Sequence, residues 1–387
     1  MVENLTQARM KIVLLGTSAA ISLHFRRLLI EKCIQEGHTV YVLCSDYTDS
    51  TKKDIQALGA IPVHSPLSRS MINPIRVLIE LFQLKKIITD INPDMVFSFF
   101  AKPVIFGTLA AKFAGVKHIC AMLEGMGYYF TKRPEADSMQ TKLIRAIMIY
   151  LYRLSMPFAK ALIVLNQQDL LEITNVYRIK PQATYVLGGI GVNIHQFVYV
   201  PPSQDHVNFL FVGRLLYDKG IREFITAAKA VKQKFPHVRF TVVGDIDPEN
   251  PASLSAAEKQ YLSEQNIIHF KGYKNDVMQE YLKASVFVLP SYREGVSLSI
   301  QEAMNVGRAV ITASVPGCVD VIQDGRTGFI VPPFDAQAIE NKMIYFIMNP
   351  EKVRELGYNA HSYAKRHFNG ILQTEKLYDI LMHDAGH

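Results

Sequence analysis

Two acidic residues flank the start of a predicted helix in the segment 290–304 (PSYREGVSLSIQEAM). An apolar strand at 286–289 precedes it, Glu294 lies in the following loop, and a helix begins near Ser297. Backbone amides and the positive end of such a helix can hold an anion. The carboxylates of Glu294 and Glu302 suit sugar hydroxyls, which donate hydrogen bonds to them. The segment therefore predicts a cradle for a nucleotide sugar, and the alternative is a capped core helix with two solvated acids.

Two cations follow the first predicted strand of the second half, in GRLLYDKG at 213–220. Arg214 and Lys219 could clamp a diphosphate, while Gly213 and Gly220 would let the backbone approach it closely. The alternative, which an isolated pair at this spacing favours, is two solvated surface cations.

The first half of the chain offers two further candidates. Lys102 opens a predicted helix at the end of a strand and could contact an acceptor phosphate, or it could be a partly buried cation. Glu124, in LEGMG at 123–127, could act at the acceptor or at the anomeric carbon, or it could be an acid in a glycine-rich loop that holds nothing. No nucleophile stands out.

No metal site and no cofactor are predicted. Asp245-Ile246-Asp247 matches a D-x-D pattern, but it follows a glycine and runs into a proline, which indicates a turn. Two cations and a helix terminus can stabilise a departing diphosphate without a metal.

The elements that must position these residues alternate between strand and helix, which favours a parallel sheet with helices on both faces. We expect strands at 11–15, 39–43, 61–63, 95–99, 117–122, 161–165, 183–187, 207–212, 238–243, 267–270, 285–289, 309–312 and 328–331. We expect helices at 23–36, 50–58, 73–90 (capped by Asn73), 103–114, 220–235, 255–264, 275–283 and 297–306, and a helical stretch from 335 to 387.

The length of 387 residues exceeds the ~250–300 residues at which one core stops growing, so two domains are expected. A turn-rich stretch at 198–206 marks the boundary, and the alternation restarts after it. Open sheets of this kind bind ligands at the carboxyl ends of their strands, so two facing sheets would bring both sets of loops into one cleft.

Composition excludes several classes of protein. Hydrophobic residues make up 49% of the chain, which excludes disorder, and the four cysteines are too far apart for a zinc site or a disulfide scaffold. Free thiols favour a reducing compartment. Residues 1–200 carry 22 Lys and Arg against 14 Asp and Glu, and the remainder carries 20 against 21, so the first half should have an anionic partner. No nucleic-acid motif is present, and nucleic acid is not predicted as a partner.

The stretch 139–160 interrupts the alternation and combines Lys142, Arg145 and Arg153 with large apolar residues. It could lie on an anionic membrane surface, as a lipid-linked acceptor would require, or it could be a buried crossover helix. No apolar run is long enough to span a membrane.

The chain resembles the retaining glycosyltransferases of family 4, which have the GT-B fold, over about residues 11 to 370. The resemblance rests on GRLLYDKG, on LPSYREGVSLSIQEAM with its E-x7-E spacing, on the VPGC turn and on DGRTGFIVPPFD. KPVIFG at 102–107 and LEGMGYYFT at 123–131 are similar to the N-terminal half of the bacterial capsule, O-antigen and exopolysaccharide enzymes. Ser297-Leu298 departs from the Pro-Arg of many relatives, which we expect to tune the phosphate or sugar environment.

The resemblance implies an acceptor-binding Rossmann-like domain over 1–198, a nucleotide-sugar domain over 199–365 and a terminal helix over 366–387 that packs back on the first. Its implied catalytic residues are Arg214, Lys219 and Glu294, and Glu124 in the LEGMG loop is a further catalytic candidate. Its implied donor-binding residues are Gly16, Gly213, Lys274, Gly295, Val296, Ser297 and Glu302. Its implied acceptor-side residues are Thr17, Lys102 and Gly125.

The reaction implied is transfer of a hexose or N-acetylhexosamine, with retention, from a nucleoside-diphosphate sugar (UDP is expected) to a polyprenyl-diphosphate-linked glycan. The enzyme would work in the cytoplasm on the inner face of the plasma membrane, in the synthesis of a surface polysaccharide or glycoprotein glycan. A nucleotide-sugar epimerase of the same two-domain shape is the alternative, and it would need no acceptor. A dehydrogenase is disfavoured because the first strand runs into GTSAA and not G-x-G-x-x-G.

Overall fold

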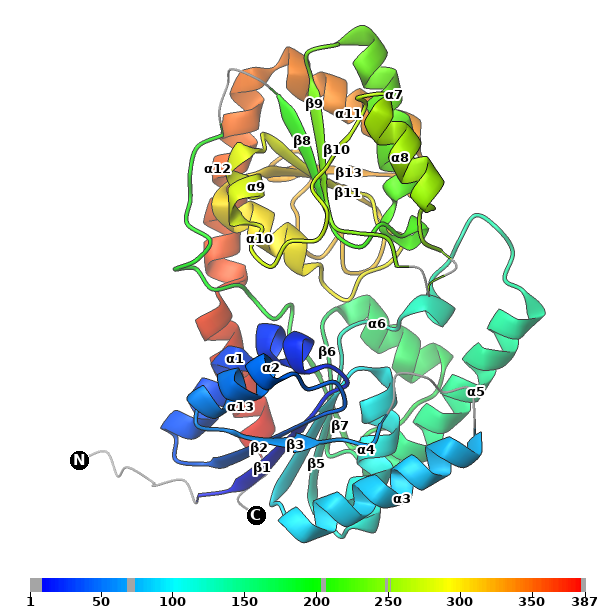
Figure 1. Cartoon of the computed structure of the whole chain (residues 1–387), viewed down its shortest axis with the longest axis vertical. Coiled ribbons are helices and arrows are strands. Elements are labelled where there is room, and N and C mark those ends of the chain that lie inside the picture. Colours follow the sequence, from blue (N-terminus) through cyan, green and yellow to red (C-terminus); the bar gives the residue numbers. More distant parts are fainter. Residues whose placement is uncertain (1–8, 68–73, 203–206, 248–249, 251, 384–387) are drawn as a thin grey trace. The chain divides into compact units, whose positions relative to one another are not determined.

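The computed structural model describes residues 9–67, 74–202, 207–247, 250 and 252–383. The chain divides into two compact units (Figure 1). Unit 1 contains residues 1–129, 138–190 and 371–387, and unit 2 contains residues 130–137 and 191–370.

Unit 1 is built on a parallel sheet of seven strands in the order β3-β2-β1-β4-β5-β6-β7. Its strands are β1 (Lys11–Leu15), β2 (Thr39–Cys44), β3 (Ile61–His64), β4 (Met95–Phe99), β5 (His118–Leu123), β6 (Ala161–Val164) and β7 (Ala183–Val186). Its helices are α1 (Ala19–Gln35), α2 (Asp49–Ala57), α3 (Pro74–Ile91), α4 (Ala101–Phe113), α5 (Met139–Ser155), α6 (Gln167–Leu171) and α13 (Gly370–Met382).

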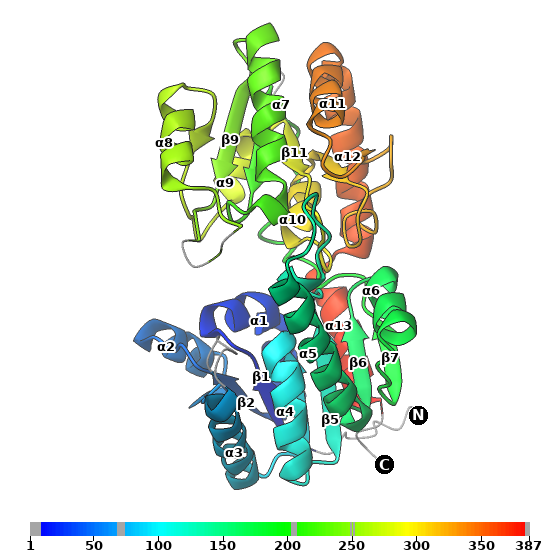
Figure 2. The ribbon, with the colours of Figure 1, turned by 90° about the vertical axis from the view of Figure 1, so that its right-hand side faces the viewer.

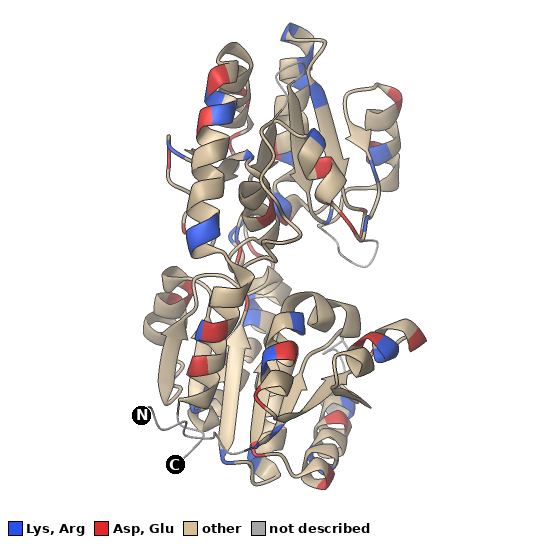
Figure 3. Cartoon of the chain, turned by 90° about the vertical axis from the view of Figure 1, so that its left-hand side faces the viewer, with Lys and Arg blue, Asp and Glu red and all other residues tan. Residues whose placement is uncertain are grey.

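Helices cover both faces of this sheet, with α1, α2 and α13 on one side and α3, α4 and α5 on the other (Figures 1 and 2). Every residue of β4, β5 and β6 is buried, which explains why these strands are apolar without alternation. Charged positions accordingly lie mainly on helices and loops (Figure 3).

Unit 2 is built on a parallel sheet of six strands in the order β10-β9-β8-β11-β12-β13. Its strands are β8 (Asn208–Val212), β9 (Arg239–Val243), β10 (His269–Phe270), β11 (Val286–Leu289), β12 (Ala309–Ala313) and β13 (Gly328–Val331). Its helices are α7 (Ile221–Lys234), α8 (Ala256–Glu264), α9 (Met278–Lys283), α10 (Leu298–Val306), α11 (Ala336–Met348) and α12 (Pro350–His367).

Both sheets are doubly wound, as predicted. The strand order reverses between β1 and β4 in unit 1 and between β8 and β11 in unit 2. Such a reversal opens a crevice at the carboxyl ends of the two strands, which is where open α/β sheets bind ligands. The loops after these four strands are therefore the predicted ligand-binding loops.

Each unit contains a segment that is distant in sequence. Residues 130–137 join unit 2, where Arg133 forms a two-pronged ion pair with Asp218 at 2.8 and 2.7 Å. The terminal helix α13 joins unit 1, as predicted, and Tyr378 on it lies 2.8 Å from Nε2 of His38. Lys376 donates to the carbonyl of Leu187 at 2.8 Å.

Most predicted elements occur at the expected positions, and the differences lie at their ends. Helix α1 begins at Ala19, four residues before the predicted start, because Asp46 accepts a hydrogen bond from the Ala19 amide at 2.6 Å. The helical stretch after 335 consists of three helices. Unit 1 gives way to unit 2 after residue 190, compared with the predicted boundary at 198. The predicted cap Asn73 lies outside the described residues.

Two further findings concern compartment and membrane. All four cysteines are buried free thiols. Among the described residues, no helix combines the length and the apolar character that crossing a membrane requires.

Candidate active site

The loops that follow β8 and β11 pack against each other in unit 2. Gly220 has φ of +75°, and a Cβ at this position would lie 2.1 Å from the carbonyl oxygen of Pro290. The amide of Tyr292 donates to the carbonyl of Asp218 at 2.9 Å. The two loops therefore form one framework at the crevice of this sheet.

Lys219 and Glu294 meet in this framework. Lys219 Nζ donates to both carboxylate oxygens of Glu294, at 2.6 and 2.8 Å. Ser291 Oγ donates to Oε1 of the same carboxylate at 2.6 Å. The carboxylate is thus oriented from two sides. The sequence predicted both charged residues at the site but not that they pair.

Arg214 has a different partner. Its side chain is 63% exposed, and Nη1 lies 3.2 Å from Oδ2 of Asp247. An ion pair this exposed is weak, so the guanidinium can change partners at little cost. Asp245 pairs in turn with Lys259 at 2.6 Å. Both acids of the D-x-D pattern therefore face cations, and no group of three or more metal-ligating side chains occurs in the described part of the chain.

The start of helix α10 presents buried backbone at the same edge of the sheet. Ser297 caps this helix, and its hydroxyl accepts a hydrogen bond from the Ile300 amide at 3.4 Å. Gly295 and Val296, directly before the cap, are buried. Helix α10 thus begins where the predicted anion cradle requires it to begin.

A glycine in the turn after β12 supports this loop. Gly317 has φ of +75°, and a Cβ there would lie 2.3 Å from the carbonyl oxygen of Glu294 and 2.5 Å from that of Gly295. The Glu294 amide donates to the carbonyl of Pro316 at 3.1 Å. The VPGC turn therefore packs directly against the Glu294 loop. Any side chain larger than that of glycine at position 317 would push the loop away.

Glu302 lies inside α10 and is 6% exposed. The hydroxyl of Tyr281 donates to Oε2 of this carboxylate at 2.9 Å. Burial raises the pKa of Glu302 to about 7, and the hydrogen bond from Tyr281 opposes this shift. Burial thus favours the protonated form of this carboxyl group in the folded protein.

The remaining donor-side candidates lie in the loops after β8 and β10. Lys274 contacts the buried Glu280 at 2.5 Å. Two residues before Lys274, the carbonyl of Gly272 accepts a hydrogen bond from Gly244 at 2.9 Å. Gly213, directly after β8, donates to the carbonyl of Val243 at 3.0 Å.

In unit 1, Gly16 and Thr17 follow β1 at the reversal of the strand order. A Cβ on Gly16 would lie 2.6 Å from Cε2 of Phe99 and from Oγ of Ser22, so glycine is required for close packing. The Thr17 carbonyl accepts a hydrogen bond from Ser45 Oγ at 2.9 Å.

Lys102 is buried at 5% exposure and lies at the start of α4. Its ammonium group contacts Oε2 of Glu80 on α3 at 2.8 Å. Because Lys102 is buried and paired, it is more similar to the partly buried cation considered as the alternative than to a lysine open to an acceptor phosphate.

Glu124 forms an ion pair with Arg26, a residue that the sequence interpretation missed. Arg26 is 1% exposed, and its guanidinium lies 4.7 Å from the centre of the Phe99 ring. Burial lowers the pKa of Arg26 to about 9. Gly125 follows Glu124 with φ of +136°.

A signal for Arg26 does exist in the sequence. It lies on the same helical face as Leu23, Leu29 and Ile30, all of which are buried. An arginine on an apolar face is rarely buried without a partner, so its position alone pointed to a buried acid.

Comparisons with known proteins cover nearly the whole chain. Residues 198–363 match the family model described as glycosyl transferases group 1, and residues 11–166 match the model described as glycosyl transferase 4-like. An N,N'-diacetylbacillosaminyl-diphospho-undecaprenol alpha-1,3-N-acetylgalactosaminyltransferase of Campylobacter jejuni is 29% identical over 96% of this chain and 98% of its own. A UDP-Gal:alpha-D-GlcNAc-diphosphoundecaprenol alpha-1,3-galactosyltransferase of Escherichia coli is 24% identical, with 80% of each chain covered.

Solved structures show the same fold. Anabaena HepE in complex with UDP-glucose superposes with a TM-score of 0.74 at 18% identity, covering 97% of this chain and 100% of that one. A sucrose-phosphate synthase of Thermosynechococcus elongatus gives a TM-score of 0.77 at 19% identity, with the same coverage.

Proposed function

We propose that this chain, which belongs to the family 4 glycosyltransferases of the GT-B fold, transfers a sugar from a nucleoside-diphosphate donor to a polyprenyl-diphosphate-linked glycan, with retention. A UDP-hexose or UDP-N-acetylhexosamine is the proposed donor, and the product would enter a surface polysaccharide or glycoprotein glycan. The Campylobacter and Escherichia relatives are both named for undecaprenol-linked sugars. This supports the same acceptor class for the present chain.

The observation that carries the proposal is the Lys219–Glu294 pair beside the start of α10. The pair lies at the strand-order reversal of unit 2, where a donor diphosphate would meet the amides of Gly295 and Val296. An ammonium group at this point stabilises negative charge on the departing diphosphate, which is the charge that develops in the transition state. Arg214, exposed and weakly held by Asp247, can join it.

The carboxylate of Glu294 would receive hydrogen bonds from hydroxyls of the donor sugar. Its existing contacts with Ser291 and Lys219 fix its orientation before the donor arrives, so little reorganisation is required on binding. Glu302 would approach the ribose. Its raised pKa makes it both a possible donor and a possible acceptor of hydrogen bonds near neutral pH.

Retention would follow a front-face course, in which the leaving phosphate helps to deprotonate the acceptor hydroxyl. In this scheme Glu124 acts on the acceptor side, and its ion pair with Arg26 holds it in place. The proposed reaction needs no metal. Loss of turnover in EDTA that a divalent ion restores would refute that part of the proposal.

A direct test compares two lysines that each pair with a glutamate in unit 2. We expect Lys219→Met to reduce acceptor-dependent UDP release at least 100-fold, because a single charge that stabilises the transition state contributes about 3–4 kcal/mol. Lys234→Met is the matched control, because Lys234 pairs with Glu340 at 2.7 Å on helices α7 and α11. We expect it to retain wild-type turnover.

The assay measures UDP release from UDP-sugars with and without a polyprenyl-diphosphate sugar. Release that depends on the acceptor supports a transferase. An epimerised sugar nucleotide formed without any acceptor would support the alternative enzyme class, and equal turnover of the two lysine variants would overturn the role of Lys219.

Helix α5 supports a peripheral position on the cytoplasmic face of a membrane. Leu143, Ile147, Tyr150 and Leu154 are all exposed on it. Their spacing places them along one helical face, while Met148 and Tyr152 on the other face are buried. The helix is therefore not the fully buried crossover considered from the sequence. Lys142 directly precedes Leu143 in the sequence and is exposed, so it can interact with anionic lipid headgroups.

Vesicle flotation tests this position. We expect Leu143→Ser with Tyr150→Ser to weaken binding to anionic vesicles at least tenfold, because each large apolar side chain contributes about 1.5–3 kcal/mol when buried. Tyr261→Ser with Met348→Ser, which removes two exposed apolar side chains from unit 2, is the control. Absence of wild-type binding at low and at high salt would remove the membrane from the proposal.

A further inference from the structure

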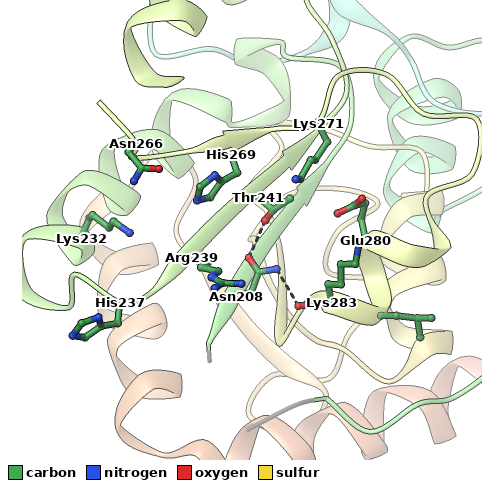
Figure 4. Close-up of a pocket in the computed structure, with 11 residues that line it drawn as sticks. Asn208, Lys232, His237, Arg239, Thr241, Asn266, His269, Lys271, Glu280 and Lys283 are labelled. Carbon is green, nitrogen blue, oxygen red and sulfur yellow. Dashed lines mark hydrogen bonds between the residues drawn. The ribbon is translucent and has the colours of Figure 1, made fainter. Parts of the chain in front are cut away.

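We infer that unit 2 has a second anion site, at the amino ends of strands β8 and β9, which binds a multiply charged phosphate group. The site is a pocket of about 740 Å³ on the sheet corner formed by β8, β9 and β10 (Figure 4). This inference does not depend on the function proposed above.

The strand register explains how the pocket arises. Arg239 and Thr241 point to one face of β9, because successive side chains alternate between faces. Thr241 pairs with His269 on β10, and Asn208 on β8 pairs with Arg239, so these side chains share that face. Lys271 follows His269 by two residues and continues the same row.

The floor of the pocket is polar and already satisfied. Thr241 Oγ1 donates to Oδ1 of Asn208 at 3.0 Å, and Nδ2 of Asn208 donates to the carbonyl of Lys283 at 3.0 Å (Figure 4). Both floor residues are buried. A ligand would therefore be held by the groups that rim this floor.

The rim is cationic. Lys232, Arg239, Lys271 and Lys283 line the pocket, together with His237 and His269. Among the described residues, the side chains of Arg239, Lys271 and Lys283 have no ion-pair partner. The only acidic group lining the pocket in the described chain is Glu280, which Lys274 already neutralises at 2.5 Å.

The electrostatic environment of His269 agrees with this geometry. Its pKa lies below the ordinary value because of partial burial and because Lys271, Lys232 and Arg239 repel a further positive charge. Three cations thus lie close enough to the His269 imidazole to disfavour its protonated form. An anion bound there would remove the repulsion and raise the pKa of His269.

The chemistry favours a phosphate group of diphosphate charge. The planar fork of an arginine next to several ammonium groups matches phosphate oxygens, and several cations without ion-pair partners favour an anion with more than one charge. Among the described residues, no phenylalanine, tyrosine or tryptophan lines the pocket, so the imidazoles of His237 and His269 are the only rings that could stack on a nucleotide base. The phosphate could be free or part of a lipid headgroup.

This site is separate from the proposed donor site. Asn208 and Arg239 are the first residues of their strands, whereas Arg214 and Glu294 follow the last residues of theirs. The first and last residues of β8, and likewise of β9, lie four steps or about 13 Å apart. Lys271, which follows β10 level with Val243, is the pocket residue nearest to the carboxyl ends.

The test uses calorimetric titration of the full chain with inorganic pyrophosphate and, in a second arm, flotation on vesicles doped with phosphatidic acid. We expect Arg239→Gln with Lys271→Gln to weaken binding at least tenfold. Arg354→Gln with Lys365→Gln removes the same charge from exposed positions of α12 and should remain within twofold of wild type. Lys219→Met should leave this binding in place, which separates the pocket from the donor site.

A long-range proton–nitrogen spectrum of the wild-type imidazoles provides a readout that needs no variant except His269→Gln, which assigns the signal. Pyrophosphate should raise the pKa of His269. A response to pyrophosphate alone would identify a free phosphate, and a response only to vesicles would identify a lipid headgroup. In the Lys219→Met background, in which the proposed donor site is weakened, pyrophosphate binding that survives the Arg239 and Lys271 changes, or no binding in either arm, would overturn the inference.

Discussion

The turn that contains Gly317 allows a quantitative test of how the Glu294 loop is positioned. An alanine Cβ at this position would lie 2.3 Å from the Glu294 carbonyl oxygen, whereas ordinary contact begins at 3.4 Å, so the turn or the loop must move by about 1 Å. A displacement of this size at a catalytic group costs on the order of 100-fold in rate. We therefore expect Gly317→Ala to lower kcat/KM for sugar transfer about 100-fold.

Gly325 provides the matched control. It also has a left-handed backbone, with φ of +68°, but nothing lies within 4 Å of a Cβ built on it. Gly325→Ala should lose about 1–2 kcal/mol of stability through backbone strain, as measured by urea unfolding, and Gly317→Ala should lose more because the clash adds to the same strain. Only Gly317→Ala should lose activity. Equal losses of activity in the two variants, or full activity of Gly317→Ala, would show that steric support of the Glu294 loop is not what sets turnover.

Two further predictions concern buried charges. The pKa of Glu302 is about 7 in the folded protein against an ordinary 4.5, so the folded state binds this proton more tightly than the unfolded chain does. The free energy of unfolding is therefore highest below about pH 4.5 and falls as the pH rises through 7. The shift corresponds to about 3 kcal/mol. We expect urea unfolding to show wild type losing about that much between pH 4 and 8 relative to Glu302→Gln, and parallel profiles would contradict the assigned burial. Arg26→Met should cost about 3–5 kcal/mol because it leaves Glu124 unpaired, and adding Glu124→Gln should restore part of the loss; a double variant no more stable than Arg26→Met would argue against the pair.

The sequence was sufficient to predict both sheets, because buried parallel strands are short apolar runs and helices end at glycines such as Gly37 and Gly115. Fully buried strands such as β4 carry this signal in every residue. The start of α1 could not be predicted in the same way. It depends on Asp46, which is distant in sequence and reaches the helix only after β1 and β2 have paired.

The sequence indicated which residues lie on the loop and the helix of the candidate site, but not which contacts they make. The spacing of Glu294 and Glu302 indicated the loop and the helix, since both residues are fixed by one strand–helix turn. The choice of Glu294 as partner for Lys219 arises from the packing of Gly220 against Pro290, which no local pattern reveals. Pairing of Lys102 with Glu80 likewise depends on the tertiary contact between two helices.

The exchange of segments between the units limits how the protein can be divided. A fragment that ends at residue 190 lacks α13, and with it the partner of His38 and the lysine that binds the carbonyl of Leu187. A fragment that begins at residue 191 lacks Arg133, the ion-pair partner of Asp218. Chimeras with related enzymes should therefore swap residues 371–387 together with the N-terminal portion, and should take 130–137 from the parent that supplies the C-terminal portion.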